Sequence, residues 1–184
     1  MTNKIEKMLI EKCSPTLAGI KTANLFSIKI YDDFFENLQK MNEKLQEKHV
    51  YIKVLKIQNS NALLYVYRKK SLLKDLNNNK VQEILSEIGY KQGNLDIILE
   101  KLASRIGFND EFPHEIGLFL GYPLEDVVGF ICNKGKKCAM CGYWKVYSDI
   151  DHAKKKFMQF DKCQRVYKKI WSEGSRDIMR LTVA

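Results

Sequence analysis

The chain has 184 residues, of which 45% are hydrophobic and 29% are charged, and its formal net charge is +9. This length is sufficient to bury a core, and we expect a single domain over residues 1–184. No apolar run approaches the roughly 18 residues of a membrane span, and the N-terminal stretch has Glu inside it, which excludes a secretory signal. We therefore expect a cytoplasmic protein with no membrane segment.

The basic charge could indicate a nucleic-acid partner, but most of it comes from lysine. Arginine, which reads phosphates and guanine edges through paired hydrogen bonds, occurs only at Arg68, Arg105, Arg165, Arg176 and Arg180. Lysines spread along helices more often form a solvated face. A nucleic-acid-binding or regulatory adaptor that uses Lys-rich helices such as 154–169 is therefore kept as an alternative function.

The first half of the chain alternates between helical and strand-like patterns. Residues 3–12 predict an amphipathic helix that Pro15 ends, and 25–30 show strand-like alternation within an ambiguous stretch. Asp32 and Asp33 precede a helix with apolar residues at 34, 38, 41 and 45. Residues 50–57 and 62–68 are rich in β-branched and aromatic residues around an Asn-Ser-Asn turn, which predicts a hairpin.

The second half is mostly helical. Ser71 is expected to cap a short helix, Gly89 to stop the next, and Asn94 to cap a third that ends at Gly107. Two short helices follow within 112–131, and then a strand over 143–147. Ser148 and Asp151 resemble a capping box at the start of a long helix that Gly174 ends. The alternation of residues 179–183 indicates a final strand.

These patterns predict an α+β fold, with about seven helices around a small, mainly antiparallel sheet that contains the hairpin and the 143–147 strand. The helices and strands do not alternate as βαβ units. The Gly-rich phosphate-binding fingerprints are also absent from the sequence.

The stretch 112–147 concentrates the residues that could carry chemistry. Gly121 fits a left-handed residue between two helices, and Pro123 begins the second one. Gly117 and Gly129 lie inside these helices, where glycine usually marks a close approach. One interpretation is a tight corner whose polar residues only cap helices. The other places four polar side chains at one cavity, namely His114, Glu115, Tyr122 and Asp126.

Within this stretch, His114 and Glu115 are the candidate catalytic acid–base pair, because imidazole titrates near neutral pH. A strand over 143–147 would send Tyr143, Lys145 and Tyr147 to one face, where they could stack on a planar ligand and meet an anion. The alternative for that face is packing within a half-exposed sheet.

The cysteines suggest a metal or redox site. Cys138 and Cys141 form one C-x2-C knuckle, half of a zinc or iron–sulfur site, with Cys163 and His152 as possible further ligands. Cys132 is a poor ligand candidate because it ends a helix expected to be buried. A metal or redox accessory protein built on Cys138 and Cys141 is the third candidate function, and the sequence does not identify a cofactor.

Several long motifs carry a resemblance that covers nearly the whole chain. SPTLAGIKTANLF, YVYR, FPHEIGLFLGYPLEDVVGFI, GYWKVY and FxxFxKCxxVY resemble a bacterial family of uncharacterised proteins that share a domain of unknown function. The resemblance implies a single cytosolic domain and no particular activity or cofactor. The positions of the family type are Ser14, Thr16, Lys21, Asn24, Arg68, His114, Glu115, Gly121, Tyr122, Pro123, Asp126, Trp144, Lys145 and Tyr147.

Buried polar groups cost free energy unless they are satisfied, so such a polar set points either to a shared pocket or to a network that fixes the fold. Our leading hypothesis is a small-molecule-binding or enzymatic domain whose polar pocket recognises an anionic ligand. The pocket would lie at the Gly121-Tyr122-Pro123 corner, faced by the GYWKVY strand and by the Ser14–Asn24 segment. The expected ligand-binding residues are Ser14, Thr16, Lys21, Asn24, Arg68, Tyr122, Asp126, Lys145 and Tyr147.

Overall fold

The computed structural model describes residues 4–91, 93–106, 112–174 and 177–184, which form two compact units. Unit 1 comprises residues up to Lys70 together with those from Gln159 onward, and unit 2 comprises Ser71–Met158. Helices α3 and α8 contribute residues to both. The single domain expected over 1–184 stays a prediction, and each unit is described by itself.

Unit 1 is built on a three-stranded antiparallel sheet with strand order β1-β3-β2. The turn between β2 and β3 has positive φ at Asn59 (49°) and Ser60 (58°), as a two-residue hairpin turn requires. The predicted hairpin is therefore confirmed. The elements of unit 1 are α1 (Lys4–Leu17), β1 (Ala23–Lys29), α2 (Phe34–Gln46), β2 (Val50–Gln58), β3 (Asn61–Arg68), the second part of α8 (Ile150–Ser172) and α9 (Ile178–Leu181).

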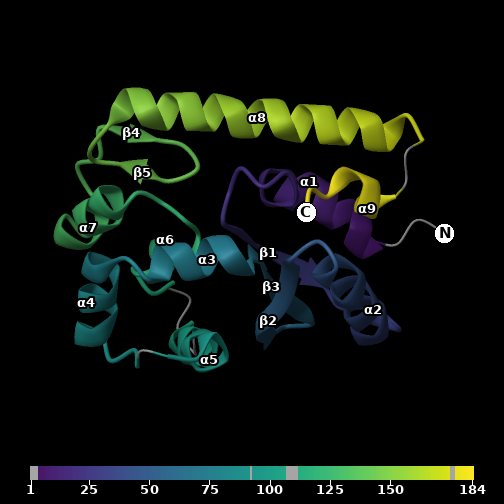
Figure 1. Cartoon of the computed structure of the whole chain (residues 1–184), viewed down its shortest axis with the longest axis horizontal. Helices are drawn as coiled ribbons and strands as arrows, with labels where there is room; N and C mark the ends of the chain where they lie inside the picture. The colour runs from purple at the N-terminus through teal and green to yellow at the C-terminus, as the bar shows by residue number, and fades with distance from the viewer. Residues whose placement is uncertain (1–3, 92, 107–111, 175–176) are drawn as a thin grey trace. The chain divides into compact units, whose positions relative to one another are not determined.

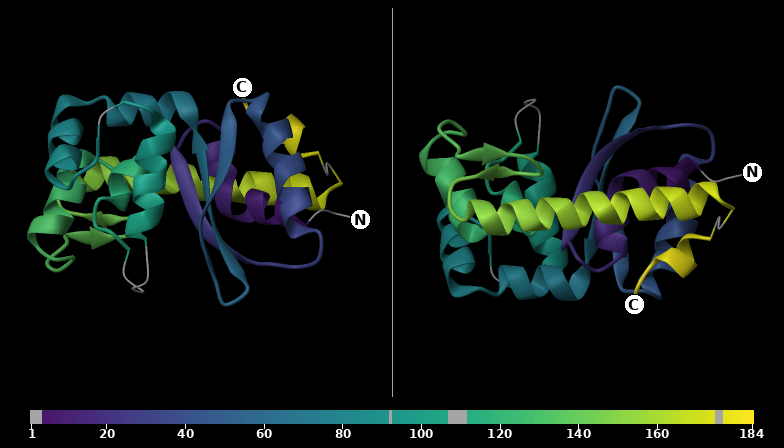
Figure 2. Two further views of the ribbon diagram at one scale, coloured as in Figure 1. Left: turned by 90° about the horizontal axis from the view of Figure 1, so that it is seen from below. Right: turned by 90° about the horizontal axis from the view of Figure 1, so that it is seen from above.

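Helices α1 and α2 pack on the same face of this sheet (Figures 1 and 2). The core between them joins one apolar stripe from each helix to alternate residues of the strands, as the 3.6- and 2-residue periods dictate. Its members include Ile5, Leu9, Phe34, Leu38, Met41, Leu45, Ile52, Leu64 and Val66.

Unit 2 is mainly helical. Asn78 and Asn94 cap α4 and α5, since each side-chain oxygen accepts from a backbone N–H of the first turn. The elements of unit 2 are α3 (Lys69–Leu76), α4 (Asn79–Glu87), α5 (Leu95–Arg105), α6 (Ile116–Phe119), α7 (Leu124–Cys132), β4 (Met140–Cys141), β5 (Lys145–Val146) and the first part of α8.

The fold is α+β, as predicted, but its details differ. The described residues form nine helices rather than about seven, and α6 is a single turn. The strand expected over 143–147 is reduced to β5, which pairs with β4 in a two-stranded sheet separate from the hairpin. Trp144 and Val146 are buried, and Tyr143, Lys145 and Tyr147 are half-buried, so the expected alternation of faces holds.

Pro15 does not end the first helix, which continues to Leu17. A proline this close to a helix end removes only one backbone hydrogen bond. Its own carbonyl then accepts from the N–H groups of Ile20 and Lys21, at 3.0 and 3.1 Å, which closes the helix. Pro15 is also buried, so its ring contributes to packing.

Two helix caps and the final strand were also predicted wrongly. Ser71 lies inside α3 instead of capping it. Asp149 rather than Ser148 caps α8, because its carboxylate accepts from the His152 N–H at 2.8 Å. The final strand expected over 179–183 is replaced by α9, whose first turn Asp177 caps through the Met179 N–H. The expected helix end at Gly107 lies outside the described residues.

Candidate functional site

Unit 2 contains a cavity of about 240 Å³ beside the α6–α7 corner. Four of the predicted site residues line it: His114, Tyr122, Asp126 and Lys145. The lining is mostly apolar, unlike the polar pocket that the sequence suggested. The remaining lining residues are Phe112, Pro113, Ile116, Gly117, Val127, Phe130 and Trp144.

The corner is closed by glycines, as expected. Gly121 has a positive φ of 71° and joins the two helices. A Cβ on Gly117 would lie 2.8 Å from the Val127 side chain and 3.2 Å from that of Tyr122, and one on Gly129 would lie 2.5 Å from Cβ of Tyr147. The absent side chains therefore let α6, α7 and the segment around β5 approach one another.

Asp126 connects α7 to the segment 144–148 in one wall of the cavity. Its side chain is 3% exposed, and its Oδ2 accepts from the Trp144 indole N–H at 2.7 Å. Its Oδ1 accepts from the Tyr147 N–H at 2.8 Å, the Ser148 N–H at 2.9 Å and the Ser148 hydroxyl at 2.8 Å. These four bonds use the capacity of the carboxylate, so they fix the wall rather than leave an acceptor for a ligand. They also explain why Ser148 does not cap α8.

Aromatic rings form the walls. The Tyr122 and Trp144 rings lie 5.1 Å apart at 31°, and His114 meets the edge of Phe130 at 5.3 Å and 64°. Behind Trp144, Phe157 of α8 packs edge-on at 4.5 Å. Burial raises the pKa of Tyr122 to about 12, so this phenol stays protonated at neutral pH.

Lys145 brings a positive charge to the cavity. Its Nζ donates to the Gly135 carbonyl at 2.7 Å and lies 5.7 Å from the centroid of the Phe130 ring. An ammonium group has three donors, and the carbonyl accepts one. The side chain is thus held in place with donor capacity that could serve an anion.

Glu115 does not line this cavity. Its carboxylate is 2% exposed and accepts from the Tyr90 hydroxyl at 3.0 Å and from the Arg105 guanidinium. Burial first, and the Glu115 carboxylate second, raise the pKa of Tyr90. The structure thus gives Glu115 two partners that the sequence did not suggest, while the acid–base pairing of His114 with Glu115 stays a prediction.

Tyr147 lies behind the lining. Its backbone belongs to the Asp126 network, but its hydroxyl oxygen is buried and has no hydrogen-bond partner among the described residues. Burial of the hydroxyl first, and then the nearby thiols of Cys138 and Cys141, raise the pKa of Tyr147.

All five cysteines are free thiols. Cys132, expected to be buried, is exposed at the end of α7, because the helix presents its last turn to solvent. Within the described ranges, no group of three or more His, Cys, Asp or Glu side chains could hold a metal ion. Zinc or iron–sulfur binding by Cys138 and Cys141 stays a prediction.

The N-terminal candidates belong to unit 1 and bond to groups of that unit. The Ser14 hydroxyl donates to the Ile10 carbonyl, and the Thr16 hydroxyl donates to Oδ1 of Asn24 at 2.7 Å. Hydroxyl bonds of this kind close the end of α1 and tie it to β1.

Arg68, at the end of β3, is 8% exposed and binds three backbone carbonyls. Its Nε donates to Thr16 at 2.6 Å, and its Nη2 donates to Leu17 at 2.7 Å and to Val183 at 2.6 Å. These carbonyls belong to the end of α1 and to the C-terminal residues, and those of Thr16 and Leu17 also accept from the N–H groups of Gly19 and Val183. Burial lowers the pKa of this guanidinium.

Lys21 is also buried, at 8% exposed, and its Nζ donates to the Ala23 carbonyl at 2.7 Å. Burial lowers its pKa to about 8, an effect that the nearby Cys13 thiol partly offsets. Binding roles for Ser14, Thr16, Lys21, Asn24 and Arg68 stay predictions, as does a pocket shared with the residues of unit 2.

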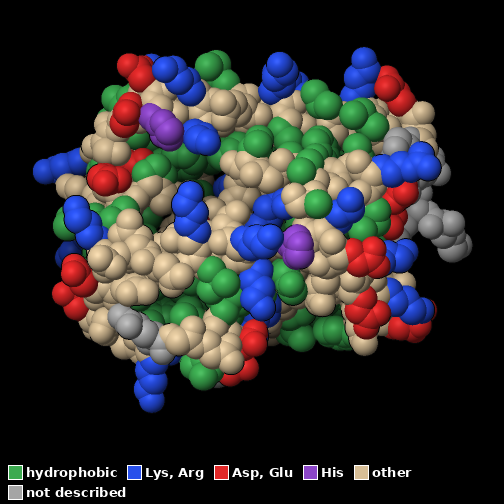
Figure 3. Space-filling model, in the orientation of Figure 1, with side chains coloured by type: hydrophobic (Ala, Val, Ile, Leu, Met, Phe, Trp, Pro, Cys, Tyr) green, Lys and Arg blue, Asp and Glu red, His purple; other side chains and the backbone are tan. Residues whose placement is uncertain are grey.

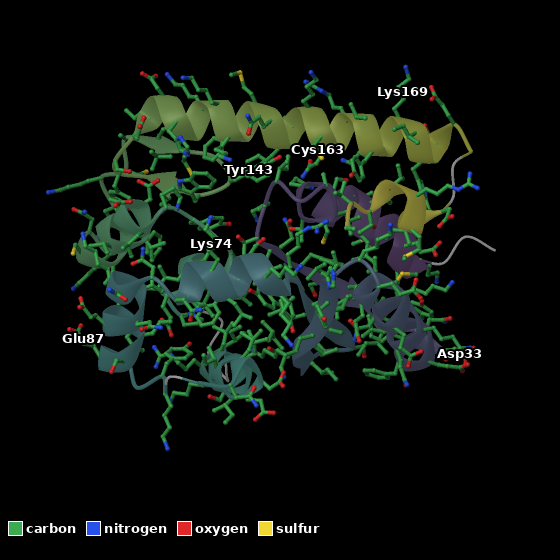
Figure 4. All side chains as sticks on the ribbon, in the orientation of Figure 1. Asp33, Lys74, Glu87, Tyr143, Cys163 and Lys169 are labelled. Carbon is green, nitrogen blue, oxygen red and sulfur yellow. The ribbon has the colours of Figure 1, made fainter. Side chains whose placement is uncertain are left out.

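The Lys-rich stretch 154–169 lies within α8, and Figure 3 shows basic side chains spaced along this helix. Figure 4 shows Lys169 on the outer side of α8 and Cys163 on its inner side, in line with their exposure. The spacing describes a solvated face, and nucleic-acid binding by α8 stays a prediction.

The lining residues that sequence reasoning missed are aromatic or aliphatic. Phe112 is 47% exposed, and Phe130 belongs to a helix whose apolar residues predict a buried stripe. Aromatic residues are dense on both sides of the Gly-Tyr-Pro corner in the sequence. This density favours an aromatic pocket over a polar one.

In the part of the chain that the structure describes, no helix is both long enough and apolar enough to cross a membrane. No curated protein and no solved structure matches the chain. Residues 9–182 match the family described as "Protein of unknown function (DUF3793)", which agrees with the resemblance of the motifs. The chain belongs to this family.

Proposed function

We propose that unit 2 binds a small, flat organic anion in the cavity beside the α6–α7 corner. The observation that carries this proposal is the position of Lys145, whose ammonium group is fixed at the edge of a cavity with aromatic walls. Small-molecule sites typically combine an apolar lining with a few well-placed polar groups.

The walls favour a planar ligand. Tyr122 and Trp144 form a tilted pair, and His114 and Phe130 form an edge-on pair. Aromatic rings prefer offset or edge-on partners at such separations, so a flat ring between the pairs would bury apolar area on both faces. A volume of about 240 Å³ equals that of roughly eight water molecules in the liquid, at about 30 Å³ each. This is about the size of a single-ring acid.

The charges favour an anion. Among the lining residues Lys145 brings a basic side chain, whereas the Asp126 carboxylate is already bound by four donors. A carboxylate at Lys145 would form a charge-assisted hydrogen bond, worth about 1.5–3 kcal/mol when partly desolvated. The uncharged amide of the same acid would lose most of this energy.

The test compares benzoate with benzamide. The chain has two tryptophans, so a Trp171→Phe background leaves Trp144, in the cavity wall, as the only indole fluorophore. Benzoate should change Trp144 fluorescence saturably and bind at least about tenfold more tightly than benzamide. Lys145→Gln should remove this difference, while Lys136→Gln, which changes an exposed lysine between α7 and β4, should leave it within about twofold.

Two results would overturn the proposal. One is the lack of a saturable response to benzoate and to related single-ring carboxylates up to about 10 mM, a concentration that covers even weak binding. The other is equal affinity for acid and amide together with an unchanged response in Lys145→Gln, which would separate the cavity from anion recognition.

A further inference from the structure

Strand β2 of unit 1 carries a basic and aromatic strip that the cavity of unit 2 does not explain. The strip consists of Tyr51, Lys53 and Lys56, which are all half-buried. It lies on the face of the sheet opposite to the core, because Val50 and Ile52 point into the core under α1 and α2 and successive side chains of a strand alternate.

A bulge in β2 brings the two lysines of this strip onto one face. Lys53 and Lys56 are three positions apart, so a regular strand would point them in opposite directions. The register with β3 shifts between Val54 and Lys56, which leaves one extra residue in β2. Lys53 pairs with Tyr65. Lys56 pairs with Leu63, which lies two positions from Tyr65 and therefore on the same face.

An aromatic stack supports the strip. Tyr51 lies across from Tyr67 in the ladder, and their rings are stacked with centroids 5.6 Å apart and planes at 24°. The Tyr67 ring also stacks on that of Tyr65, at 5.1 Å and 18°. Tyr65 and Tyr67 are buried, whereas Tyr51 is half-buried, so Tyr51 is the ring of this stack that a ligand can reach.

Four further basic residues lie at one end of the strip. The chain enters β2 through Lys48 and His49 and leaves β3 through Lys69 and Lys70. The first residue of β2 pairs with the last residue of β3, so both segments lie at the same end of the sheet. The Lys69 ammonium group is 5.7 Å from the centroid of the Tyr51 ring. Figure 3 shows basic side chains gathered beside a histidine where Figure 1 labels β1 and β3.

The sheet supplies no carboxylate to neutralise this charge. The three strands contain neither Asp nor Glu. Within the described ranges, Lys48, Lys53 and Lys70 form no salt bridge. Their ammonium groups thus keep hydrogen-bonding capacity for an anionic partner.

We propose that the β2 strip and the basic residues at its end bind single-stranded nucleic acid. Tyr51 stacks on an unpaired base, and Lys53 and Lys69 on either side of it contact phosphates. Proteins that bind single strands without sequence preference combine a row of positive charge with aromatic rings in this way.

The aromatic ring within the row favours a single strand over other polyanions. A duplex keeps its bases paired and stacked inside, so it offers phosphates to the lysines but no base to Tyr51. A lipid surface favours exposed aliphatic side chains, which the strip lacks. This function is additional to the binding of a small anion in unit 2, and it uses other residues.

The experiment measures the fluorescence anisotropy of a labelled oligothymidylate of about 12 nucleotides, within the size range of known single-strand sites. The full-length protein should bind it saturably at about 20 mM salt and lose affinity with a slope of about −3 in a log–log plot against salt, as about four phosphate contacts require. A duplex of the same length should bind about tenfold more weakly.

The variants separate charge from stacking. Lys53→Gln and Lys69→Gln should each weaken binding and reduce the salt slope by about 0.7. Tyr51→Leu should weaken binding by at least about fivefold and leave the salt slope unchanged, because it removes a stacking surface and no charge. The control Lys12→Gln/Lys40→Gln changes exposed lysines of α1 and α2 and should leave the affinity within about twofold.

Far-UV circular dichroism and urea titration of each variant verify that the fold is kept. The proposal is overturned if the oligonucleotide shows no saturable binding at about 20 mM salt, or if the control variant weakens binding as much as the variants of the strip. It is also overturned if Lys155→Gln/Lys162→Gln abolishes binding while the strip variants retain it, since the nucleic acid would then lie on α8. Equal affinity for duplex and single strand, with Tyr51→Leu unchanged, would contradict base stacking.

Discussion

The two units use their polar side chains in different ways. In unit 1, Arg68 and Lys21 are buried and donate to backbone carbonyls, and Thr16 bonds to Asn24. In unit 2, Lys145 is held by a single carbonyl and lines a cavity. Basic side chains thus bond to backbone near a helix end in unit 1, whereas a basic side chain lines a cavity in unit 2.

A polar set that a family shares can either form a ligand pocket or fix the fold. Asp126 lines the cavity, yet its four hydrogen bonds give it a structural role. A residue that lines a pocket therefore need not bind a ligand. The better criterion is whether its side chain has hydrogen-bonding capacity that the protein leaves unused.

The largest effect is expected at Asp126. Asp126→Ala leaves the Trp144 indole, two backbone N–H groups and the Ser148 hydroxyl without their acceptor. Loss of several buried partners should lower the free energy of unfolding by about 4 kcal/mol in urea titrations. Glu125→Ala, its exposed neighbour in α7, should change it by less than about 0.5 kcal/mol. A loss near that of the control would mean that Asp126 is not the structural centre of the wall.

At Arg68, the comparison predicts a slightly smaller loss. Arg68→Met removes one donor from each of three carbonyls, at the end of α1 and in the C-terminal residues, and we expect a cost of about 3 kcal/mol. Arg180→Met, which removes a largely exposed pair with Asp177, is the matched control and should cost less than about 0.5 kcal/mol. If anion binding is instead the role of Arg68, Arg68→Met should be tolerated in phosphate-free buffer, and phosphate should stabilise only the wild type.

Lys21 gives a pH-dependent test. Burial lowers its pKa to about 8 in the folded state, from 10.5, so between these values the unfolded chain binds more protons. Stability should therefore rise with pH across this window, while the full penalty of the buried charge is present below pH 8. Relative to Lys21→Met, the wild type should gain about 2 kcal/mol between pH 7 and pH 10.

Lys12→Met, at an exposed position of α1, serves as the control and should follow the wild type across the same range. Parallel stability curves for the wild type and Lys21→Met would show that the amine is solvated, which would move Lys21 to the class of side chains able to serve a ligand.

Local patterns predicted the fold well where one face of an element is buried. The apolar residues at 34, 38, 41 and 45 identify α2, and the turn at Asn59 identifies the hairpin, because both signals lie within one element. The alternation at Met179, Leu181 and Val183 misled, since five residues cannot distinguish a strand from one helical turn.

The site was only partly accessible from the sequence. The cavity lies within 112–147, the stretch in which special residues are dense in the sequence, and its walls come from consecutive elements. The roles within it depend on bonds between residues far apart, such as that of Glu115 with Tyr90 and that of Asp126 with Ser148. No spacing rule relates residues 22 or 25 positions apart, so a carboxylate that binds a ligand and one that binds a hydroxyl look alike in the sequence.

The smallest effect is expected at Thr16. It tests whether Thr16 and Asn24 act only on each other. Thr16→Val keeps the shape but removes the hydroxyl that donates to Asn24 across the α1–β1 junction. A single partly buried bond between neutral groups contributes about 1 kcal/mol. A double-mutant cycle with Asn24→Ala should recover most of this as coupling energy, because the pair is the interaction that both changes remove. A coupling near zero, with each single change still costly, would mean that both side chains act through a third group, and Thr16 and Asn24 would then rejoin the candidates for ligand binding.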